Sequence, residues 1–315
     1  MPTYHMEGAA TVASSIAHNG DREGTTVYFR TEKVVQPDGS VVHVPIGSGN
    51  GMRGLLRDIS ADLLWDLMGQ PTLPPPVYHF LYAGGQLAKA GSGKVMSSRQ
   101  LAQLRQMVPH VGLFGGSGAG RIIEGRLRVG KLVPIVAETV HIVPPQLVTG
   151  AERSIYEYTQ IEEFSRRDDT HRAASAHAIE GAARRELTGD TILTVDAEPA
   201  KPRGDDEPAT QMRYGVQTLP AGLRLHWWIT LDRVTEMEAG WFAAVLRQWA
   251  ADGGVFGGRS ATGHGRLILD TGNGWANTQR AITAGAGSLP EAVDITQHVT
   301  QHRDQILELL HQVGA

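Results

Sequence analysis

Three glycine-rich stretches with arginines carry the most distinctive chemistry of this chain. The first glycine stretch spans residues 46–58 (IGSGNGMRGLLRD), the second residues 113–121 (LFGGSGAGR) and the third residues 256–267 (FGGRSATGHGRL). Glycines let a ligand approach backbone N–H groups closely, and guanidinium groups bind phosphate oxygens in a planar fork. We interpret the three stretches as parts of one groove for a polyanionic strand.

The first glycine stretch leads into a predicted helix that runs to about residue 68. Ser48 and Asn50 are candidate N-caps, and the apolar residues after them recur at helical spacing. Arg53 and Arg57 are one helical turn apart, so both side chains would face the same phosphate track beside the positive end of the helix dipole. The alternative is a capped surface helix whose arginines are merely solvated.

Periodicity predicts the elements that position these stretches. Strands are predicted at residues 3–16, 25–35, 41–46, 121–136, 223–231 and 266–269, with turns at 19–21 and 37–39. Further helices are predicted at residues 97–107, 235–251 and 292–313, and the three prolines at 74–76 are expected to break the chain. This order of elements favours an α+β fold with a modified ferredoxin-like (RRM-like) antiparallel sheet.

A segment of different composition interrupts this pattern. Residues 150–215 are rich in Arg, Glu, Asp and Ala, and residues 197–211 have loop composition. We interpret this segment as an insertion that is partly helical and partly mobile. The chain would then consist of residues 1–149, the insertion at 150–215, and residues 216–315 with a C-terminal helix.

Four motifs, taken in order, resemble the RAMP superfamily of CRISPR-associated proteins. They are a Gly-Ser turn entering a helix with Arg53, Leu113-Phe114-Gly115 before a basic strand, Leu219-Pro220-Ala221-Gly222 before an aliphatic strand, and Gly257-Gly258-Arg259-Ser260-Ala261-Thr262-Gly263-His264-Gly265. The resemblance covers roughly the first half and the last third of the chain. Within the superfamily, the chain is most similar to the repeating subunit that lines guide RNA in class 1 effector complexes.

The resemblance implies a hand-like molecule. Residues 1–149 and 216–315 would form the palm, and residues 150–215 an inserted thumb. The implied function is sequence-independent binding of the guide RNA backbone, by copies of the chain joined head to tail in a helical filament with other CRISPR effector subunits. No cofactor, metal or catalytic residue is expected. The residues expected to bind RNA are Ser48, Gly49, Asn50, Arg53, Arg57, Gly115, Gly116, Ser117, Arg121, Gly257, Gly258, Arg259, Ser260, His264 and Arg266.

RNA cleavage is the second hypothesis. Some RAMP subunits cut RNA with an aspartate shortly before the first glycine stretch, but residues 25–30 (TTVYFR) hold no acid, and Asp21 and Glu23 lie upstream. Other RAMP proteins process guide RNA with histidine as a general base, for which His18 and His264 are candidates. The missing acid, the absence of cysteine and the short insertion make the chain most similar to the type IV group. A RAMP endoribonuclease remains the alternative function.

Other motifs give weaker signals. Ala90-Gly91-Ser92-Gly93-Lys94 is similar to a P-loop, which makes a nucleotide-binding enzyme the third hypothesis, but Val95 stands where Ser or Thr would bind magnesium. His298 and His302 are one helical turn apart and lack the glutamate of a zinc protease motif, so a surface or core pair is the commoner explanation. Trp228 lies on the polar face of its strand, where it would stack on a base, contribute to a subunit interface or pack within the protein.

Composition sets outer limits on the function. The chain has 315 residues and no cysteine, which excludes disulfides and thiolate metal sites. Its net charge of −4 is unlike that of a generic nucleic-acid coat, although residues 99–131 carry several arginines and Glu124 as their single acid. No apolar run is long enough to span a membrane and no signal peptide is visible, so a cytoplasmic setting without membrane contact is expected.

Overall fold

The strand predicted at 223–231 forms the centre of the main sheet. The computed structural model describes residues 1–85, 95–118, 120–166, 212–270, 289 and 293–314. In it, strand β13 (Arg224–Leu231) pairs antiparallel with β1 (Tyr4–Val12) on one side, and with β9 (Leu127–Val129) and β10 (Val133–Pro134) on the other. Strand β1 also pairs antiparallel with β14 (Leu267–Asp270), so the order of the main sheet is β10-β13-β1-β14 with β9 beside β13.

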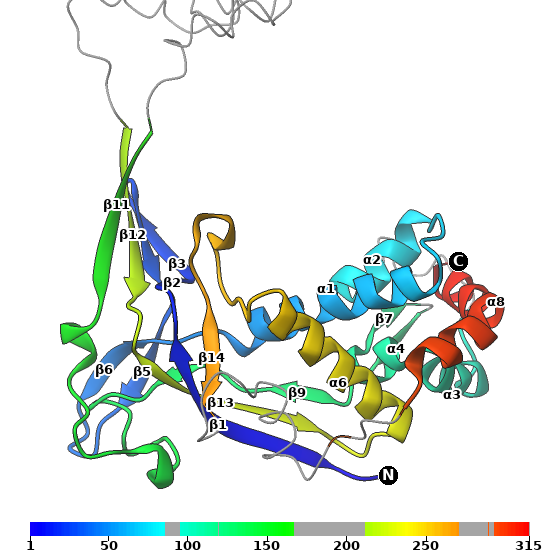
Figure 1. Cartoon of the computed structure of the whole chain (residues 1–315), viewed down its shortest axis with the longest axis horizontal. Coiled ribbons are helices and arrows are strands. Elements are labelled where there is room, and N and C mark those ends of the chain that lie inside the picture. Colours follow the sequence, from blue (N-terminus) through cyan, green and yellow to red (C-terminus); the bar gives the residue numbers. More distant parts are fainter. Residues whose placement is uncertain (86–94, 119, 167–211, 271–288, 290–292, 315) are drawn as a thin grey trace, which may run out of the picture.

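One face of this sheet is apolar and is covered by helices. Along β13, Leu225, Trp227 and Ile229 are at most 8% exposed, as the alternation predicted. They pack toward α1 (Gly49–Leu67) and α6 (Glu236–Ala251), which lie together over the sheet (Figure 1). The remaining longer helices gather beside this pair: α2 (Pro75–Ala83), α3 (Ser98–Met107), α4 (Pro109–Phe114) and α8 (Ile295–Gly314).

A second sheet lies away from these helices and carries the flanks of the predicted insertion. Strand β12 (Met212–Leu219) pairs antiparallel with β11 (Gln160–Arg166) and β2 (Ile16–Ala17), and parallel with β4 (Thr26–Phe29), which in turn pairs with β3 (Asn19–Glu23). Figure 1 shows β11 and β12 rising together from this sheet. The rest of the insertion, residues 167–211, lies outside the described residues.

Two small hairpins and three short 3-10 helices complete the described structure. The hairpins are β5 (Thr31–Val35) with β6 (Val41–Pro45), and β7 (Gly116–Gly118) with β8 (Arg121–Ile123). The 3-10 helices are η1 (Pro145–Leu147), η2 (Ile155–Glu157) and η5 (Ser260–Thr262). Together with the helix-covered antiparallel sheet, these elements confirm the predicted α+β class and are compatible with a ferredoxin-like palm.

Several local predictions were wrong because backbone contacts override the sequence pattern. Residues 19–21 are part of strand β3 and not a turn, and the chain turns instead at Gly24, whose φ is +56°. The predicted strand at 25–35 is divided between two sheets at Arg30. Its N–H donates to His18 O at 3.0 Å, and its carbonyl accepts from Ile46 N at 2.9 Å, so the strand changes partners there.

The region around the second glycine stretch also differs from its prediction. Residues 121–136 form three short strands, β8, β9 and β10, because the buried Gly130 lies under the ring of Trp228 and interrupts the run. The prolines at 74–76 open helix α2, where proline fits the first turn, since an N–H at that position has no intrahelical partner. Helix α4 was not predicted, because six residues are too few to show a helical period.

Candidate nucleic-acid interface

The first and third glycine stretches line one groove. Its volume is about 670 Å³, and its walls include Gly51 and Leu55 from α1 and Gly257 and Ser260 from the third glycine stretch, with His18 beside them. Gly258 N donates to Ala17 O at 2.7 Å, which fixes the third stretch against β2. The groove therefore joins two segments that are far apart in the sequence.

The N-terminal end of α1 opens at this groove. Ser48 is its N-cap, as predicted, and the Ser48 hydroxyl oxygen accepts a hydrogen bond from Gly51 N at 3.3 Å. The backbone N–H groups of Gly49 and Asn50 have no acceptor among the described residues. Free amides at the positive end of a 19-residue helix form a site that favours an anion.

Arg53 and Arg57 converge on a single backbone carbonyl. Arg53 Nη2 donates to Phe114 O at 2.6 Å and Arg57 Nη2 donates to the same oxygen at 2.7 Å. Both guanidinium carbons lie 5.8 Å from the centre of the Phe114 ring. Neither arginine forms an ion pair with a carboxylate of the described residues. Two partly buried positive charges thus share one neutral acceptor.

The electrostatics of this pair reflect burial and mutual repulsion, which the charge of Asp58 offsets only in part at Arg57. Burial, and secondarily the positive charge of Arg53, lowers the pKa of Arg57 to about 10, and burial also lowers the pKa of Arg53. The Arg57 Nε atom is buried without a hydrogen-bond partner. Gly84, with φ of +70°, leaves room for the Arg57 guanidinium, because a Cβ there would lie 1.6 Å from Nη1. An anion brought to this pair would relieve the repulsion between the two guanidiniums.

The second glycine stretch lies on another side of α1 from the groove. On the helix, Gly51 and Leu55 face the groove while Arg53 and Arg57 reach Phe114, and positions two residues apart point in nearly opposite directions. Ser117 N donates to Gly84 O at 2.7 Å, so one of the amides expected to bind RNA is used within the protein.

The residues of the second glycine stretch differ in their access to solvent. The side chains of Ser117 and Arg121 are exposed, whereas Gly115 is buried and Gly116 half-buried. The structure thus joins the first and third glycine stretches in one groove and connects the second stretch to the first through the Arg53 and Arg57 side chains.

Within the third glycine stretch the predicted residues diverge in their surroundings. Ser260 lines the groove, and Arg266 is exposed just before β14. Arg259 has a φ of +61°, and its guanidinium lies over the rings of Phe164 and Tyr214, at 4.4 and 5.2 Å from their centres. The contact links the third stretch to the β11–β12 hairpin.

The two histidines considered for cleavage lie in separate environments. His18 lines the groove, and its Nε2 accepts a hydrogen bond from Ser48 N at 3.2 Å; burial, and secondarily the charge of Arg30, lowers its pKa. His264 is only 6% exposed and bonds to Ser15 Oγ at 3.0 Å. The structure does not bring these two histidines together in the groove.

Two further sequence candidates are the P-loop-like stretch and the histidine pair on the C-terminal helix. The P-loop-like residues 90–94 lie outside the described residues. His298 Nε2 donates to Met107 O at 3.0 Å, and no metal-binding cluster of three or more His, Asp or Glu occurs in the described part of the chain. None of the described helices combines the length and apolar character that crossing a bilayer requires.

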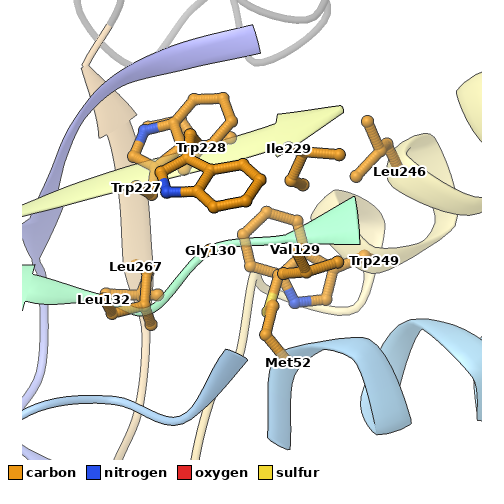
Figure 2. Close-up of a pocket in the computed structure, with 11 residues that line it drawn as sticks. Met52, Val129, Gly130, Leu132, Trp227, Trp228, Ile229, Leu246, Trp249 and Leu267 are labelled. Atoms are coloured by element: carbon orange, nitrogen blue, oxygen red, sulfur yellow. The ribbon is translucent and has the colours of Figure 1, made fainter. Parts of the chain in front are cut away.

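Trp228 packs against the protein, which is one of the three interpretations of its position. Its ring covers Gly130 and lies 6.2 Å from that of His5. It borders an apolar cavity of about 20 Å³ between the sheet and the helices, shown in Figure 2, where Met52 and Trp249 face Trp227. A space of that size, with these walls, holds at most about one water molecule and no nucleotide.

Sequence reasoning missed the aromatic and histidine neighbours of the glycine stretches. His18 was considered only as a catalytic candidate, although it holds the start of α1, and Phe164 and Tyr214 were not singled out at all. Phe164 and Tyr214 are cross-strand partners on either side of residues 167–211, so no sequence spacing reveals that they meet.

Comparison with solved structures gives an informative likeness. No family model and no curated protein matches the sequence. Among solved structures, the chain is similar to a chain of a structure described as "Type IV-B CRISPR Complex", with 25% sequence identity and a TM-score of 0.53. The match covers 87% of this chain and 92% of that chain. It supports a type IV CRISPR-associated protein, which is the coarser part of the resemblance drawn from the motifs.

Proposed function

We propose that this chain is a non-catalytic RNA-binding subunit of a type IV CRISPR effector complex. Copies of it would follow one another along a guide RNA, head to tail in a helical assembly of the RAMP type, together with other effector subunits. Binding would depend on the RNA backbone and not on base sequence, because the site offers backbone amides in the groove and the Arg53 and Arg57 guanidiniums on another side of α1, and both kinds of group contact phosphates.

The observation that carries this proposal is the unneutralised Arg53–Arg57 pair on α1, the helix whose N-terminal end opens at the groove. Both guanidiniums donate to Phe114 O and neither has a carboxylate partner in the described structure. The open amides of Gly49 and Asn50 add donors at the end of the same helix. Positive charge that the protein itself leaves unpaired is typical of a site for an external polyanion.

The direct test is whether the purified protein carries RNA. We expect an absorbance ratio typical of nucleic acid and a large size-exclusion species that shifts to smaller size after ribonuclease treatment. Added single-stranded RNAs of equal length and different sequence should bind with similar affinity, and binding should weaken as salt rises. A protein free of nucleic acid that binds none of these strands would contradict the proposal.

The same preparation distinguishes binding from cleavage. RNA incubated with the protein and Mg²⁺ should remain at its original length, because the described groove does not bring His18 and His264 together. If wild type shortens the RNA and His18→Ala leaves it intact, the endoribonuclease alternative is established instead. Lys94→Ala serves as the control for the P-loop-like motif, and its RNA affinity is expected to equal that of wild type.

A further inference from the structure

The β11–β12 hairpin rests on the third glycine stretch through one face. Glu162, Phe164 and their neighbours on β12 share that face, because side chains two residues apart on a strand point the same way. Glu162 Oε2 lies 3.7 Å from His264 Nε2, and the Phe164 ring lies under the Arg259 guanidinium. Figure 1 shows the segment before β14 beside this hairpin. Two successive positions on the hairpin thus contact two residues of the glycine stretch.

Phe164 and Tyr214 form a paired aromatic surface at this junction. They are direct cross-strand partners, with ring centres 5.6 Å apart and ring planes 20° apart. Both side chains are half-buried, so each keeps some access to solvent. The guanidinium of Arg259 lies over both rings, which makes the three side chains one layered unit.

Arg259 has a strained backbone conformation, and its side chain points toward the Phe164 and Tyr214 rings. A non-glycine residue with φ of +61° costs about 1–2 kcal/mol. The conformation is held by hydrogen bonds that its carbonyl accepts from Thr262 N at 3.0 Å and from Thr262 Oγ1 at 2.9 Å. Strained residues whose surroundings fix them in place cluster at ligand sites.

We propose that Arg259, Phe164 and Tyr214 form a stacking site for one unpaired nucleobase. Gly257 and Ser260, on either side of Arg259, line the groove, so a nucleotide whose phosphate lies there can place its base against this layered unit. Unpaired bases stack on aromatic rings and on arginine guanidinium planes. The inference deepens the proposed function and rests on it, because it assigns Arg259 to a base where the sequence predicted a phosphate contact.

The test compares a base-bearing strand with a base-free one. Wild type is titrated with single-stranded RNA and with an abasic ribose-phosphate strand of equal length at one salt concentration. Stacking on aromatic side chains is worth about 1–3 kcal/mol per base, so we expect roughly tenfold tighter binding of the base-bearing strand. Phe164→Ala with Tyr214→Ala should remove that preference and leave the salt dependence unchanged.

Arg259→Lys separates stacking from charge. Lysine keeps the positive charge but lacks the planar guanidinium, so the preference should fall while binding of the abasic strand stays the same. Matched controls are Arg128→Lys, an exposed arginine paired with Asp232, and Tyr156→Ala, a tyrosine 67% exposed on η2; both should retain the wild-type preference.

Photocrosslinking tests the stacking site in wild type alone, so the result does not depend on whether the variants fold. RNA containing 4-thiouridine should crosslink, in wild type, to peptides that hold Arg259, Phe164 or Tyr214. Crosslinks confined to other peptides, or equal affinity of wild type for the two strands, would overturn the stacking site while leaving RNA binding intact. Failure of wild type to bind either strand would instead overturn the proposed function, and the stacking site with it.

Discussion

Two regions of the molecule hold partly buried arginines, and they treat the charge in opposite ways. At the start of α6, Arg126 Nη1 donates to Glu238 Oε2 at 2.5 Å, and the Glu238 side chain is only 3% exposed. On α1, Arg53 and Arg57 share the carbonyl of Phe114 and have no carboxylate partner in the described structure. The first region, which we call the paired region, neutralises its charge internally. The second, the unpaired region, leaves two charges without a carboxylate partner.

This difference separates an arginine that supports the fold from arginines that we propose bind a ligand. Glu238 also accepts from Thr235 N at 2.8 Å, so the paired region connects β9, α6 and the cap of α6 in one network. At Arg57 the neighbouring charge of Arg53 adds to the cost of burial. Both arginines donate to the last carbonyl of α4, where positive charge is favourable, but that single oxygen does not neutralise two charges, which is consistent with the proposed binding of an anion.

The largest expected effect comes from breaking the ion pair between Arg126 and Glu238. Glu238→Ala should reduce the free energy of unfolding by about 3–5 kcal/mol, because Arg126 is left without its buried partner. Glu236→Ala, an exposed acid in the same first turn, should change it by less than about 0.5 kcal/mol. Urea unfolding measures both. RNA affinity of folded Glu238→Ala protein should match that of wild type. If its affinity falls as far as that of a variant lacking the Arg53 and Arg57 charges, the distinction between the two regions does not hold.

The next largest effect comes from removing the charges of the unpaired region, and it should appear in RNA affinity. Arg53→Gln with Arg57→Gln keeps an amide donor for Phe114 O while removing both charges. RNA affinity should fall about 100-fold, because each charge-assisted hydrogen bond is worth about 1.5–3 kcal/mol. The slope of log affinity against log salt should become shallower by about two. Stability should change little, since like-charge repulsion is removed together with the charged hydrogen bonds.

The matched control for that variant removes the same number of charges elsewhere. Arg128→Gln with Arg153→Gln eliminates two exposed arginines that are paired with Asp232 and Glu157. Its salt dependence and affinity should stay close to wild type. An equal loss in both double variants would mean that net charge alone governs binding.

A buried histidine beside the unpaired region should make stability depend on pH. His110 Nε2 donates to Leu81 O at 3.1 Å, and its Nδ1 accepts from Ser60 Oγ at 2.9 Å. Burial, with the charges of Arg57 and Arg53 adding to it, lowers the pKa of His110 to about 3. The folded state therefore favours neutral His110. Its contribution to stability is full above the unfolded pKa of about 6.5 and is lost as pH falls toward about 3.

Between about pH 7.5 and about pH 5 this linkage should cost on the order of 2 kcal/mol of unfolding free energy. Chemical denaturation across that range measures it. In His110→Gln the loss should shrink but persist in part, because the pKa of His18 is also lowered. His43→Gln, an exposed histidine on β6, should keep the wild-type profile. An unchanged profile in His110→Gln would show that this histidine does not carry the effect.

The sequence predicted the two regions unequally. Helix α1, its Ser48 cap and the spacing of Arg53 and Arg57 followed from periodicity and N-cap chemistry, and the structure confirms all three. Their shared acceptor did not follow, because Phe114 O is presented by α4, a helix of only 6 residues.

The orientation of side chains in the third glycine stretch was also beyond the sequence. The glycines indicate where the backbone turns, but they do not say which side chains face inward. His264 is buried against Ser15, and Arg259 lies over a ring pair brought together by strand register across residues 167–211. Spacing along the chain carries no information on such contacts.

The smallest expected effect compares the two helix caps, one in each region. Ser48 Oγ accepts from Gly51 N at 3.3 Å, and Thr235 Oγ1 accepts from Glu238 N at 3.1 Å. Replacing either residue by alanine should cost about 1 kcal/mol of stability, since each removes one capping hydrogen bond. Thr235→Ala should leave RNA affinity unchanged.

Ser48→Ala should weaken RNA binding as well, by a few-fold, because the first turn of α1 must hold its amides toward the groove. Measuring unfolding and RNA titration on the same two variants separates the two roles of a cap. If both variants lose stability equally and neither loses affinity, the amides of α1 do not contact the RNA, and binding must depend on the arginine pair alone.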